Sequence, residues 1–157
     1  MTAYPPIGEL LAHEPPMRLL DAVTAAAEDT LTATAGIRSD NPFYIAGQGV
    51  PSYVGIEYIA QAIAALSGWR AWQEGTPIRP GLLLGSRQLA PQRSWFVPDE
   101  IISITVTSVY SDGGMAVFDG HIHAPGGQLI LDARTTVYQP DDADSFATLI
   151  NNQSTQS

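Results

Sequence analysis

Glu57 and Gln61 are the first candidates for chemistry, because they are polar residues in a segment that is otherwise apolar. The segment from Pro51 to Gln73 is predicted to be one helix, buried on nearly every side, in which residues four apart share a face. A carboxyl group buried without a partner stays protonated near neutral pH and can act as a general acid. The spacing predicts either an acid–base role for Glu57, with Gln61 holding its orientation, or a carboxylate that faces a polar seam or pairs with an arginine.

A glycine-rich turn, Gly47-Gln48-Gly49, comes just before this helix. Its backbone N–H groups, together with the positive end of the helix dipole, suit a carbonyl oxygen that gains negative charge during a reaction. Glycines also occur before a helix simply because the turn needs them. The N–H groups at Gln48 and Gly49 are therefore candidates for polarising a substrate carbonyl, and a turn without a catalytic role is the alternative.

The three histidines give weaker signals. His13 stands just before Pro15 and Pro16, where a capping or hydrogen-bonding role is commoner than that of a general base. His121 and His123 share one face of a predicted strand but have no evident third ligand, so we assign them to ordinary strand surface or an interface. No metal site and no cofactor are predicted, since the glycine patterns of nucleotide-binding loops are absent from the sequence.

The composition limits the classes of function. The chain has 157 residues, the length of one domain, and its 7 arginines against 16 acidic residues give a net charge of −9. Such a charge is a poor match for nucleic acid, and the absence of cysteine excludes disulfides, thiolate metal ligands and a thiol nucleophile. Neither a signal peptide nor a membrane span is evident, so the sequence predicts a cytoplasmic protein without membrane insertion.

The arginines are unevenly placed along the chain. Four of them lie between Leu66 and Val97, where Glu74 is the only acidic residue. Local variation in an acidic protein produces such a stretch, and so does a surface that receives an acidic partner or a phosphate. On the second interpretation, the surface consists of Arg70, Arg79, Arg87 and Arg93.

The remaining elements must position these residues around the long helix. A short helix at Ile7–Ala12 and six strands accompany it, with turns such as Asp112-Gly113-Gly114 and Pro125-Gly126-Gly127 between them. Because nothing else in the chain can cover the helix, we predict an α+β fold in which a curved antiparallel sheet of about five to seven strands wraps around it. Residues 1–140 form this single domain, and residues 141–157 form an acidic and polar C-terminal tail. The strands are predicted at Arg18–Ala27, Thr30–Ile37, Gly81–Ala90, Glu100–Tyr110, Met115–Ala124 and Gln128–Tyr138.

Two segments resemble the 3-hydroxyacyl-acyl carrier protein dehydratases, a family with the hotdog fold. Leu10 to Val23, LLAHEPPMRLLDAV, is similar to the family's Leu-Pro-His-Arg-x-Pro-x-x-x-x-Asp run. Asn41 to Ala65, NPFYIAGQGVPSYVGIEYIAQAIAA, is similar to the Phe-x-Gly-His-Phe-Pro loop and the helix motif after it, with Pro51, Glu57 and Gln61 in register. The run VPSYVGIEYIAQAIAA followed by GLLLGSR is closer still to the divergent dehydratase-like subfamily of aryl polyene biosynthesis.

The resemblance implies a site and a reaction. In the family, a loop histidine removes the C2 proton of the substrate, and the helix carboxylate, here Glu57, handles the hydroxyl that leaves as water. Gln48 follows Gly47 where this histidine is expected, and a glutamine amide cannot act as a general base. The implied alternatives are that His13 is recruited as the base, that Glu57 works alone, or that the chain binds acyl chains without dehydrating them. The implied substrate-binding residues are Gln48, Gly49, Tyr53 and Gln61, and the implied carrier-binding residues are Arg70, Arg79, Arg87 and Arg93.

Three functions follow from the resemblance. The first is dehydration of a 3-hydroxyacyl thioester held on the phosphopantetheine arm of acyl carrier protein, in fatty-acid, polyketide or aryl polyene biosynthesis. The second is hydrolysis of an acyl thioester by a hotdog thioesterase, and the third is a non-catalytic subunit that pairs with an active dehydratase. The resemblance also implies a dimer, formed by two copies or with a related dehydratase, that is joined along a sheet edge.

Overall fold

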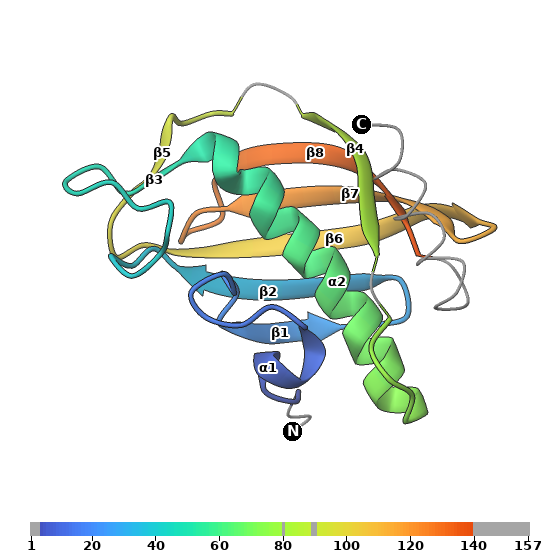
Figure 1. Cartoon of the computed structure of the whole chain (residues 1–157). Helices are drawn as coiled ribbons and strands as arrows, with labels where there is room; N and C mark the ends of the chain where they lie inside the picture. Colours follow the sequence, from blue (N-terminus) through green and yellow to red (C-terminus); the bar gives the residue numbers. More distant parts are fainter. Residues whose placement is uncertain (1–3, 80, 89–90, 140–157) are drawn as a thin grey trace, which may run out of the picture.

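The computed structural model describes residues 4–79, 81–88 and 91–139, and its main feature is one six-stranded antiparallel sheet. The strands lie in the order β1-β2-β6-β7-β8-β4, and the sheet curves around a long helix, α2 (Figure 1). The predicted α+β class and the curved sheet are therefore confirmed. The strands of this sheet are β1 (Ala22–Ala26), β2 (Thr30–Gly36), β4 (Leu82–Gln88), β6 (Ile101–Asp112), β7 (Met115–His123) and β8 (Leu129–Tyr138).

The sheet has a buried face and an open face because its strands alternate. Along β2 and β7, buried residues take turns with more exposed ones, as expected when one face packs on a core. Leu31 and Val106, which pair across β2 and β6, are both fully buried. Gly113 and Gly114 join β6 to β7 with φ angles of +58° and +87°, the left-handed values that a two-residue hairpin turn requires.

Helix α2 (Gly55–Glu74) lies against the concave face of the sheet and supplies much of the core. Tyr58, Ile59 and Leu66 are among its fully buried side chains. Gly75 ends the helix in the left-handed conformation, with φ of +70°, and donates its N–H to carbonyls of the last turn. The predicted helix is thus present, and its C-terminal end lies one residue beyond the predicted Gln73.

The N-terminal end of α2 differs from the prediction. Pro51 is not in the first helical turn, because it belongs to a two-residue strand, β3 (Val50–Pro51), that pairs with β5 (Trp95–Phe96). A 3-10 turn, η1 (Ser52–Val54), then leads into α2. Gly49 makes the pairing possible, since a Cβ atom there would lie 2.0 Å from the Phe96 carbonyl oxygen. This small second sheet had no signal in the sequence, because two-residue strands are too short to show alternation.

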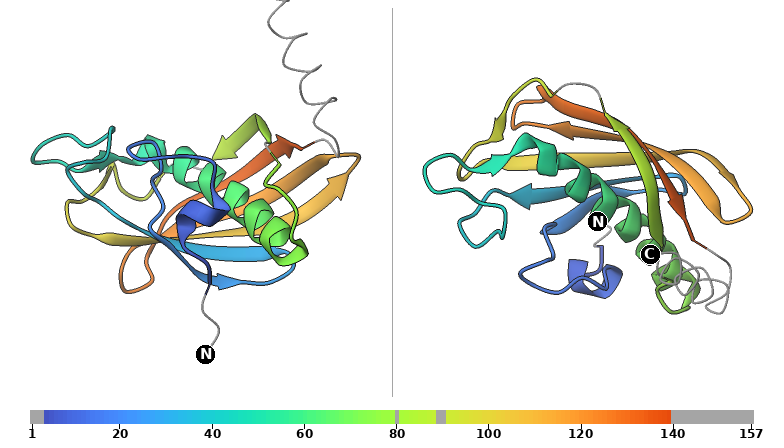
Figure 2. Two further views of the ribbon diagram at one scale, coloured as in Figure 1. Left: turned by 60° about the horizontal axis from the view of Figure 1, so that its bottom comes forward. Right: turned by 45° about the horizontal axis from the view of Figure 1, so that its top comes forward.

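The two edges of the large sheet are covered to different extents by the rest of the chain. The chain before β1, which includes the short helix α1 (Ile7–Leu10), passes over α2 and runs beside β1 (Figures 1 and 2). At that edge the Ala26 N–H donates a hydrogen bond of 3.1 Å to the Tyr4 hydroxyl. At the opposite edge, β4 leaves Leu83 and Leu84 43% and 47% exposed. Among the described residues, β4 is therefore the edge strand with the more open surface.

The strand predicted from Arg18 begins only at Ala22, because the N–H groups of Met17 and Arg18 bond to the Glu14 carbonyl in a turn. The predicted tail, residues 141–157, lies outside the described residues. Within the described residues, no helix is both long enough and apolar enough to span a membrane.

Candidate active site

Glu57 lies in the first turn of α2, and its side chain is exposed. The helix is therefore buried on fewer sides than the sequence predicted. Within the described residues, its carboxylate forms no hydrogen bond and no ion pair. The positive end of the helix dipole favours a negative charge at this position. The structure thus presents an unpartnered carboxylate at the surface of an otherwise buried helix.

Glu57 belongs to a stripe of incompletely buried residues on one side of α2, which we call the open stripe. The spacing of these residues places them on one side of the helix, and Tyr53 at its N-terminal end is 71% exposed. At the other end, the Gln139 side chain donates a hydrogen bond of 2.7 Å to the Ser67 hydroxyl. Gln139 directly follows β8, so the stripe lies on the side of α2 that faces β8 and its neighbour β4. The open stripe consists of Tyr53, Ile56, Glu57, Ala60, Ala64 and Ser67.

Gln61 contacts the N-terminal segment of the chain rather than Glu57. Its Oε1 accepts a hydrogen bond of 2.8 Å from the Leu19 N–H, and its Nε2 donates one of 2.7 Å to the Met17 carbonyl. The side chain is buried, with 5% exposed. Both ends of the amide are thus used to fix residues 17–19 against α2. The orienting role that the sequence predicted for Gln61 has no hydrogen bond to support it in the described part of the chain.

His13 lies in the segment between α1 and β1, and its side chain is exposed. In the described ranges it forms no hydrogen bond or ion pair with Glu57. Gln61 holds the same segment four to six residues further along, at Met17 and Leu19. Recruitment of His13 as the base therefore has no hydrogen bond or ion pair to Glu57, the candidate acid, to support it in these ranges.

The two N–H groups that the sequence predicted to bind the substrate carbonyl form hydrogen bonds within the turn before α2. The N–H groups of Gln48 and Gly49 both donate to the Ile45 carbonyl, at 2.9 and 3.0 Å. Gly49 in turn accepts a hydrogen bond of 2.7 Å from the Ile45 N–H through its own carbonyl. The loop is a closed turn, and polarising a substrate carbonyl through these two N–H groups would require the turn to open. The Gln48 side chain is exposed, where it can still meet a substrate.

Tyr58 and Asn41 connect this loop to the helix, and sequence reasoning missed both. The Asn41 side-chain amide donates a hydrogen bond of 2.9 Å to the Tyr58 hydroxyl, and its Oδ1 accepts one of 2.7 Å from the Phe43 N–H. Tyr58 is fully buried, with the Phe96 ring packed edge-on at 5.7 Å. Burial raises the pKa of Tyr58 to about 12, although the hydrogen bond from Asn41 opposes the shift. This hydrogen bond therefore holds the start of the loop, at Asn41, against α2 at Tyr58, the residue that follows Glu57.

Two of the four arginines assigned to a carrier surface are engaged inside the chain. Arg93 forms a two-pronged ion pair with Glu100, at 2.5 and 3.2 Å, and only 23% and 8% of the two side chains are exposed. Arg70 donates two hydrogen bonds to the Glu28 carbonyl and lies 3.6 Å from the Asp29 carboxylate. Both guanidinium groups therefore already have anionic or carbonyl partners.

The other two arginines are exposed. The Arg79 carbonyl accepts a hydrogen bond of 2.6 Å from the Gln139 side chain. Arg87 on β4 is opposite Arg134 on β8, a residue that the sequence reasoning did not single out. Of the four arginines predicted to form the surface, Arg79 and Arg87 are thus the two that are exposed.

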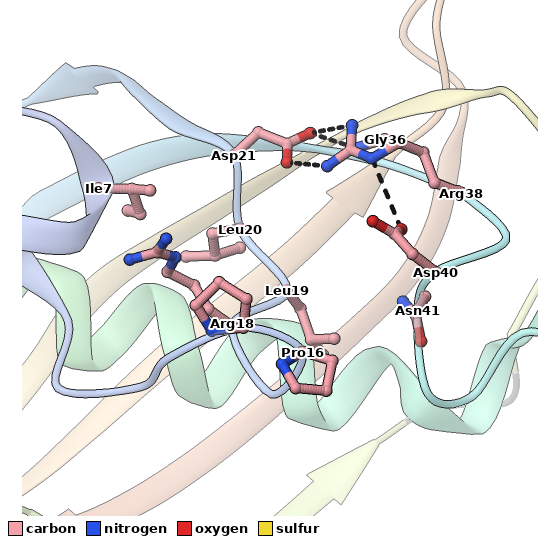
Figure 3. A pocket seen from close by; sticks show the side chains of 11 residues that line it. Ile7, Pro16, Arg18, Leu19, Leu20, Asp21, Gly36, Arg38, Asp40 and Asn41 are labelled. Carbon is pink, nitrogen blue, oxygen red and sulfur yellow. Dashed lines mark hydrogen bonds and ion pairs between the residues drawn. The ribbon is translucent and has the colours of Figure 1, made fainter.

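A pocket of about 280 Å³ lies between the N-terminal segment and the end of β2 (Figure 3). Asp21 and Arg38 form an ion pair on its wall, and Asp21 also accepts a hydrogen bond of 2.7 Å from the Gly36 N–H. Asp40 lies 3.8 Å from the Arg38 guanidinium. The pocket brings together equal numbers of anionic and cationic side chains, with Arg18 as the fourth charged residue. Glu57 is not among its lining residues.

The histidine pair on β7 has the arrangement that the sequence predicted. His121 and His123 share one face of the strand, with ring centres 6.4 Å apart. The described residues contain no group of three histidine, cysteine, aspartate or glutamate side chains that could hold a metal ion.

Comparisons with known proteins place this geometry in context. No curated protein matches the chain. Solved structures of low identity share the fold. One is a hypothetical thioesterase with coenzyme A from Streptococcus pneumoniae, which is 13% identical. The match covers 74% of this chain and 83% of the thioesterase chain, with a TM-score of 0.59. Another is the PaaI protein of E. coli, from a phenylacetic acid degradation operon, with 10% identity, coverage of 74% and 80%, and a TM-score of 0.59. These neighbours have the hotdog fold, which confirms the predicted architecture.

A further solved structure is much more similar. The chain matches a subunit of the dehydratase heterocomplex ApeI:P from Xenorhabdus doucetiae with a TM-score of 0.84 and 29% identity, over 94% of this chain and 99% of the other. The family model of the ApeP dehydratases matches residues 5–148. Because this model covers most of the chain, the chain belongs to the ApeP-like dehydratase family.

Proposed function

We propose that this chain is one subunit of a dehydratase that acts on a 3-hydroxyacyl thioester, and that it contributes Glu57 to a site completed by a second subunit. The observation that carries the proposal is the exposed, unpartnered carboxylate of Glu57 on the open stripe of α2. Membership of the ApeP-like dehydratase family supports the reaction. The heterocomplex that contains a structurally similar chain supports the second subunit.

The reaction needs two functions at the substrate. A base removes the C2 proton, the bond between C3 and the hydroxyl oxygen breaks, and an acid delivers a proton so that the hydroxyl leaves as water while the double bond forms. This chain offers Glu57 for one of these functions. For the other, Gln48 has an amide that cannot accept a proton at neutral pH, and in the described part of the chain His13 forms no hydrogen bond or ion pair with Glu57. A group from the second subunit therefore supplies the other function.

The apolar part of the open stripe suits an acyl chain. Ile56 lies just before Glu57, and Ala60 and Ala64 follow it along α2. All three are small or medium apolar residues, and Ile56 and Ala64 also pack against the core. Covering this surface would remove it from water, and a second subunit and an acyl chain are both able to do so. Delivery of the substrate by acyl carrier protein, and a cytoplasmic location, stay predictions of the sequence.

Mass spectrometry of a 3-hydroxyacyl carrier protein tests the proposal. The substrate is incubated with the chain alone and with the chain mixed with the ApeI subunit of the Xenorhabdus doucetiae heterocomplex. We expect loss of water in the mixture, and a fall in turnover of about a hundredfold for Glu57→Gln, the size of effect that losing an acid–base group produces. Glu74→Gln is the matched control, because Glu74 is an exposed carboxylate at the opposite end of the same helix.

The alternatives give different products. Release of the free carrier thiol would indicate a thioesterase. Full activity of the mixture with Glu57→Gln would assign the chemistry to the second subunit and leave this chain as a non-catalytic partner. His13→Ala separates the remaining possibility, since a loss as large as that of Glu57→Gln would make His13 the base.

A further inference from the structure

Arg18 differs from most arginines of the chain because its guanidinium has no acceptor. The side chain is half-buried, and no hydrogen bond or ion pair engages it within the residues that the structure describes. Four other guanidinium groups have carboxylate or carbonyl acceptors: those of Arg38, Arg70, Arg93 and Arg134. Removing part of a cation from water without giving it an acceptor is unfavourable, so an anion that bound to Arg18 would remove this cost.

Gly8 makes room for the Arg18 guanidinium. A Cβ atom at Gly8 would lie 2.6 Å from Arg18 Nη1, so any other residue type would force the guanidinium to move. The missing side chain therefore lets the guanidinium lie against the backbone of α1. Gly36 does the same for Arg38, since a Cβ atom there would lie 2.8 Å from Arg38 Nη1. Both arginines line the pocket between the N-terminal segment and the end of β2, and their positions on its wall depend on these two glycines.

Of these two arginines, Arg18 is the one whose charge is available to a ligand. Arg38 forms the two-pronged ion pair with Asp21. Asp40 lies 3.8 Å from Arg38, and its side chain is 83% exposed, so water weakens the field of its carboxylate. In Figure 3, the Arg18 guanidinium lies apart from these three charged groups, on the other side of Leu20. An anion that enters the pocket would therefore have Arg18 as its cationic partner.

The wall of the pocket also has an apolar part. Ile7, Leu19 and Leu20 line it, and all three side chains are buried. The volume of about 280 Å³ has room for about nine non-hydrogen atoms, if each takes the roughly 30 Å³ of a water molecule. A ligand that fits is therefore a small molecule with one anionic group and a short apolar part.

We propose that this pocket binds a small organic anion, whose carboxylate or phosphate group accepts hydrogen bonds from the Arg18 guanidinium and whose apolar part packs on Ile7 and Leu20. A planar guanidinium suits either anionic group, because it offers two parallel N–H donors. The inference goes beyond the proposed function and does not rest on it, since Glu57 does not line the pocket.

An NMR titration of the full-length chain with small anions tests the proposal. Pentanoate and monobutyl phosphate are the probes, because they share a butyl group and differ in the anionic group. Each is added at constant ionic strength, so that general screening does not change. We expect saturable shifts at the Arg18 Nε–H and at the backbone amides of Leu19 and Leu20, with a dissociation constant in the millimolar range. Acetate should bind about tenfold more weakly than pentanoate, because it lacks the CH₂ groups that pack on the apolar wall.

Two variants remove the proposed contact in different ways. Arg18→Gln removes the charge and should weaken binding of the tighter probe by about tenfold or more, the effect of losing a charge-assisted hydrogen bond. Gly8→Ala keeps every charge but places a Cβ atom against Arg18 Nη1, and should weaken binding by about threefold or more because the donors move out of line. Alanine favours a helix more than glycine does, so this variant should keep its fold. Ser111→Glu on β6 is the control, because this exposed position gives the same change in net charge as Arg18→Gln.

Saturable binding of either probe, with the expected losses in both variants and none in the control, supports the inference, and the tighter probe identifies the anionic group. Shifts that do not saturate, or that appear equally at other arginines, would indicate general attraction and overturn it. Wild-type affinity of Arg18→Gln or of Gly8→Ala would overturn it as well. Glu57→Gln should bind the probes like the wild-type chain, and a loss of binding in this variant would place the anion beside Glu57 and overturn the inference.

Discussion

Replacing Gln61 with Leu tests whether this buried amide is a clamp for the N-terminal segment. The side chain is 5% exposed and bonds to the Leu19 N–H at 2.8 Å and to the Met17 carbonyl at 2.7 Å. Leu has a similar volume but can neither accept nor donate a hydrogen bond. The substitution therefore removes both contacts while it keeps most of the packing, and the segment that contains His13 loses its attachment to α2.

The cost can be worked out from the burial of the two backbone groups. Leu19 is 7% exposed, so its N–H would remain buried without a partner, which costs about 1–3 kcal/mol. Met17 is 55% exposed, so water can replace the amide at its carbonyl, and the loss there is about 1 kcal/mol. The free energy of unfolding should fall by about 2–4 kcal/mol, which corresponds to a decrease in Tm of about 5–15 °C for a domain of this size.

Chemical denaturation and hydrogen exchange at the Leu19 amide provide the measurement. Gln61→Glu keeps the acceptor for the Leu19 N–H but loses the donor for the Met17 carbonyl, so its stability should lie below that of the wild type. Gln73→Ala, at an exposed position of the same helix, should change stability by less than about 0.5 kcal/mol. If Gln61→Leu kept its stability but lost affinity for substrate, Gln61 would line the substrate site, as the resemblance implied, and the clamp would be wrong.

Two further predictions concern buried groups. Because the pKa of Tyr58 is raised from 10.0 to about 12, the unfolded chain ionises this hydroxyl first, so stability falls by about 2 kcal/mol as the pH rises from 10 to 12. Tyr58→Phe should lack this part of the decrease in urea unfolding, and identical pH dependence of the two proteins would contradict the argument. Arg93→Met should reduce stability by about 3 kcal/mol, because it leaves the Glu100 carboxylate buried without its cation. Weaker carrier binding at unchanged thermal stability would instead restore Arg93 to the carrier surface.

The elements of the fold could largely be predicted from the sequence because their signals are local. The long apolar run defines α2, and the Gly113-Gly114 turn defines the hairpin between β6 and β7. The start of α2 could not be placed, because Pro51 is compatible with a first helical turn and with a strand end. Its pairing with Trp95 depends on residues more than forty positions away, which local patterns do not reveal.

The site was less predictable because its contacts join distant backbone groups. The sequence identified Glu57 as the unusual residue of the helix, but an apolar composition on every side does not reveal which side lacks a covering element. The spacing of Gln61 predicts that it orients Glu57, and no local pattern indicates that the backbone of Met17 and Leu19 uses both ends of its amide instead. The N–H groups of Gln48 and Gly49 were likewise assigned to substrate, although the Ile45 carbonyl accepts both.

The exposed carboxylate and the open sheet edge have a common origin in the way the chain covers its helix. The N-terminal segment covers one flank of α2, where Gly68 lets the Leu10 carbonyl approach so closely that a Cβ atom would lie 1.9 Å from it. The N-terminal segment does not cover the opposite flank, which carries Glu57 and faces β8 and β4. On the proposed function, a second subunit that covers this flank completes the site, so that a chain with Gln48 in place of a loop histidine can still take part in dehydration.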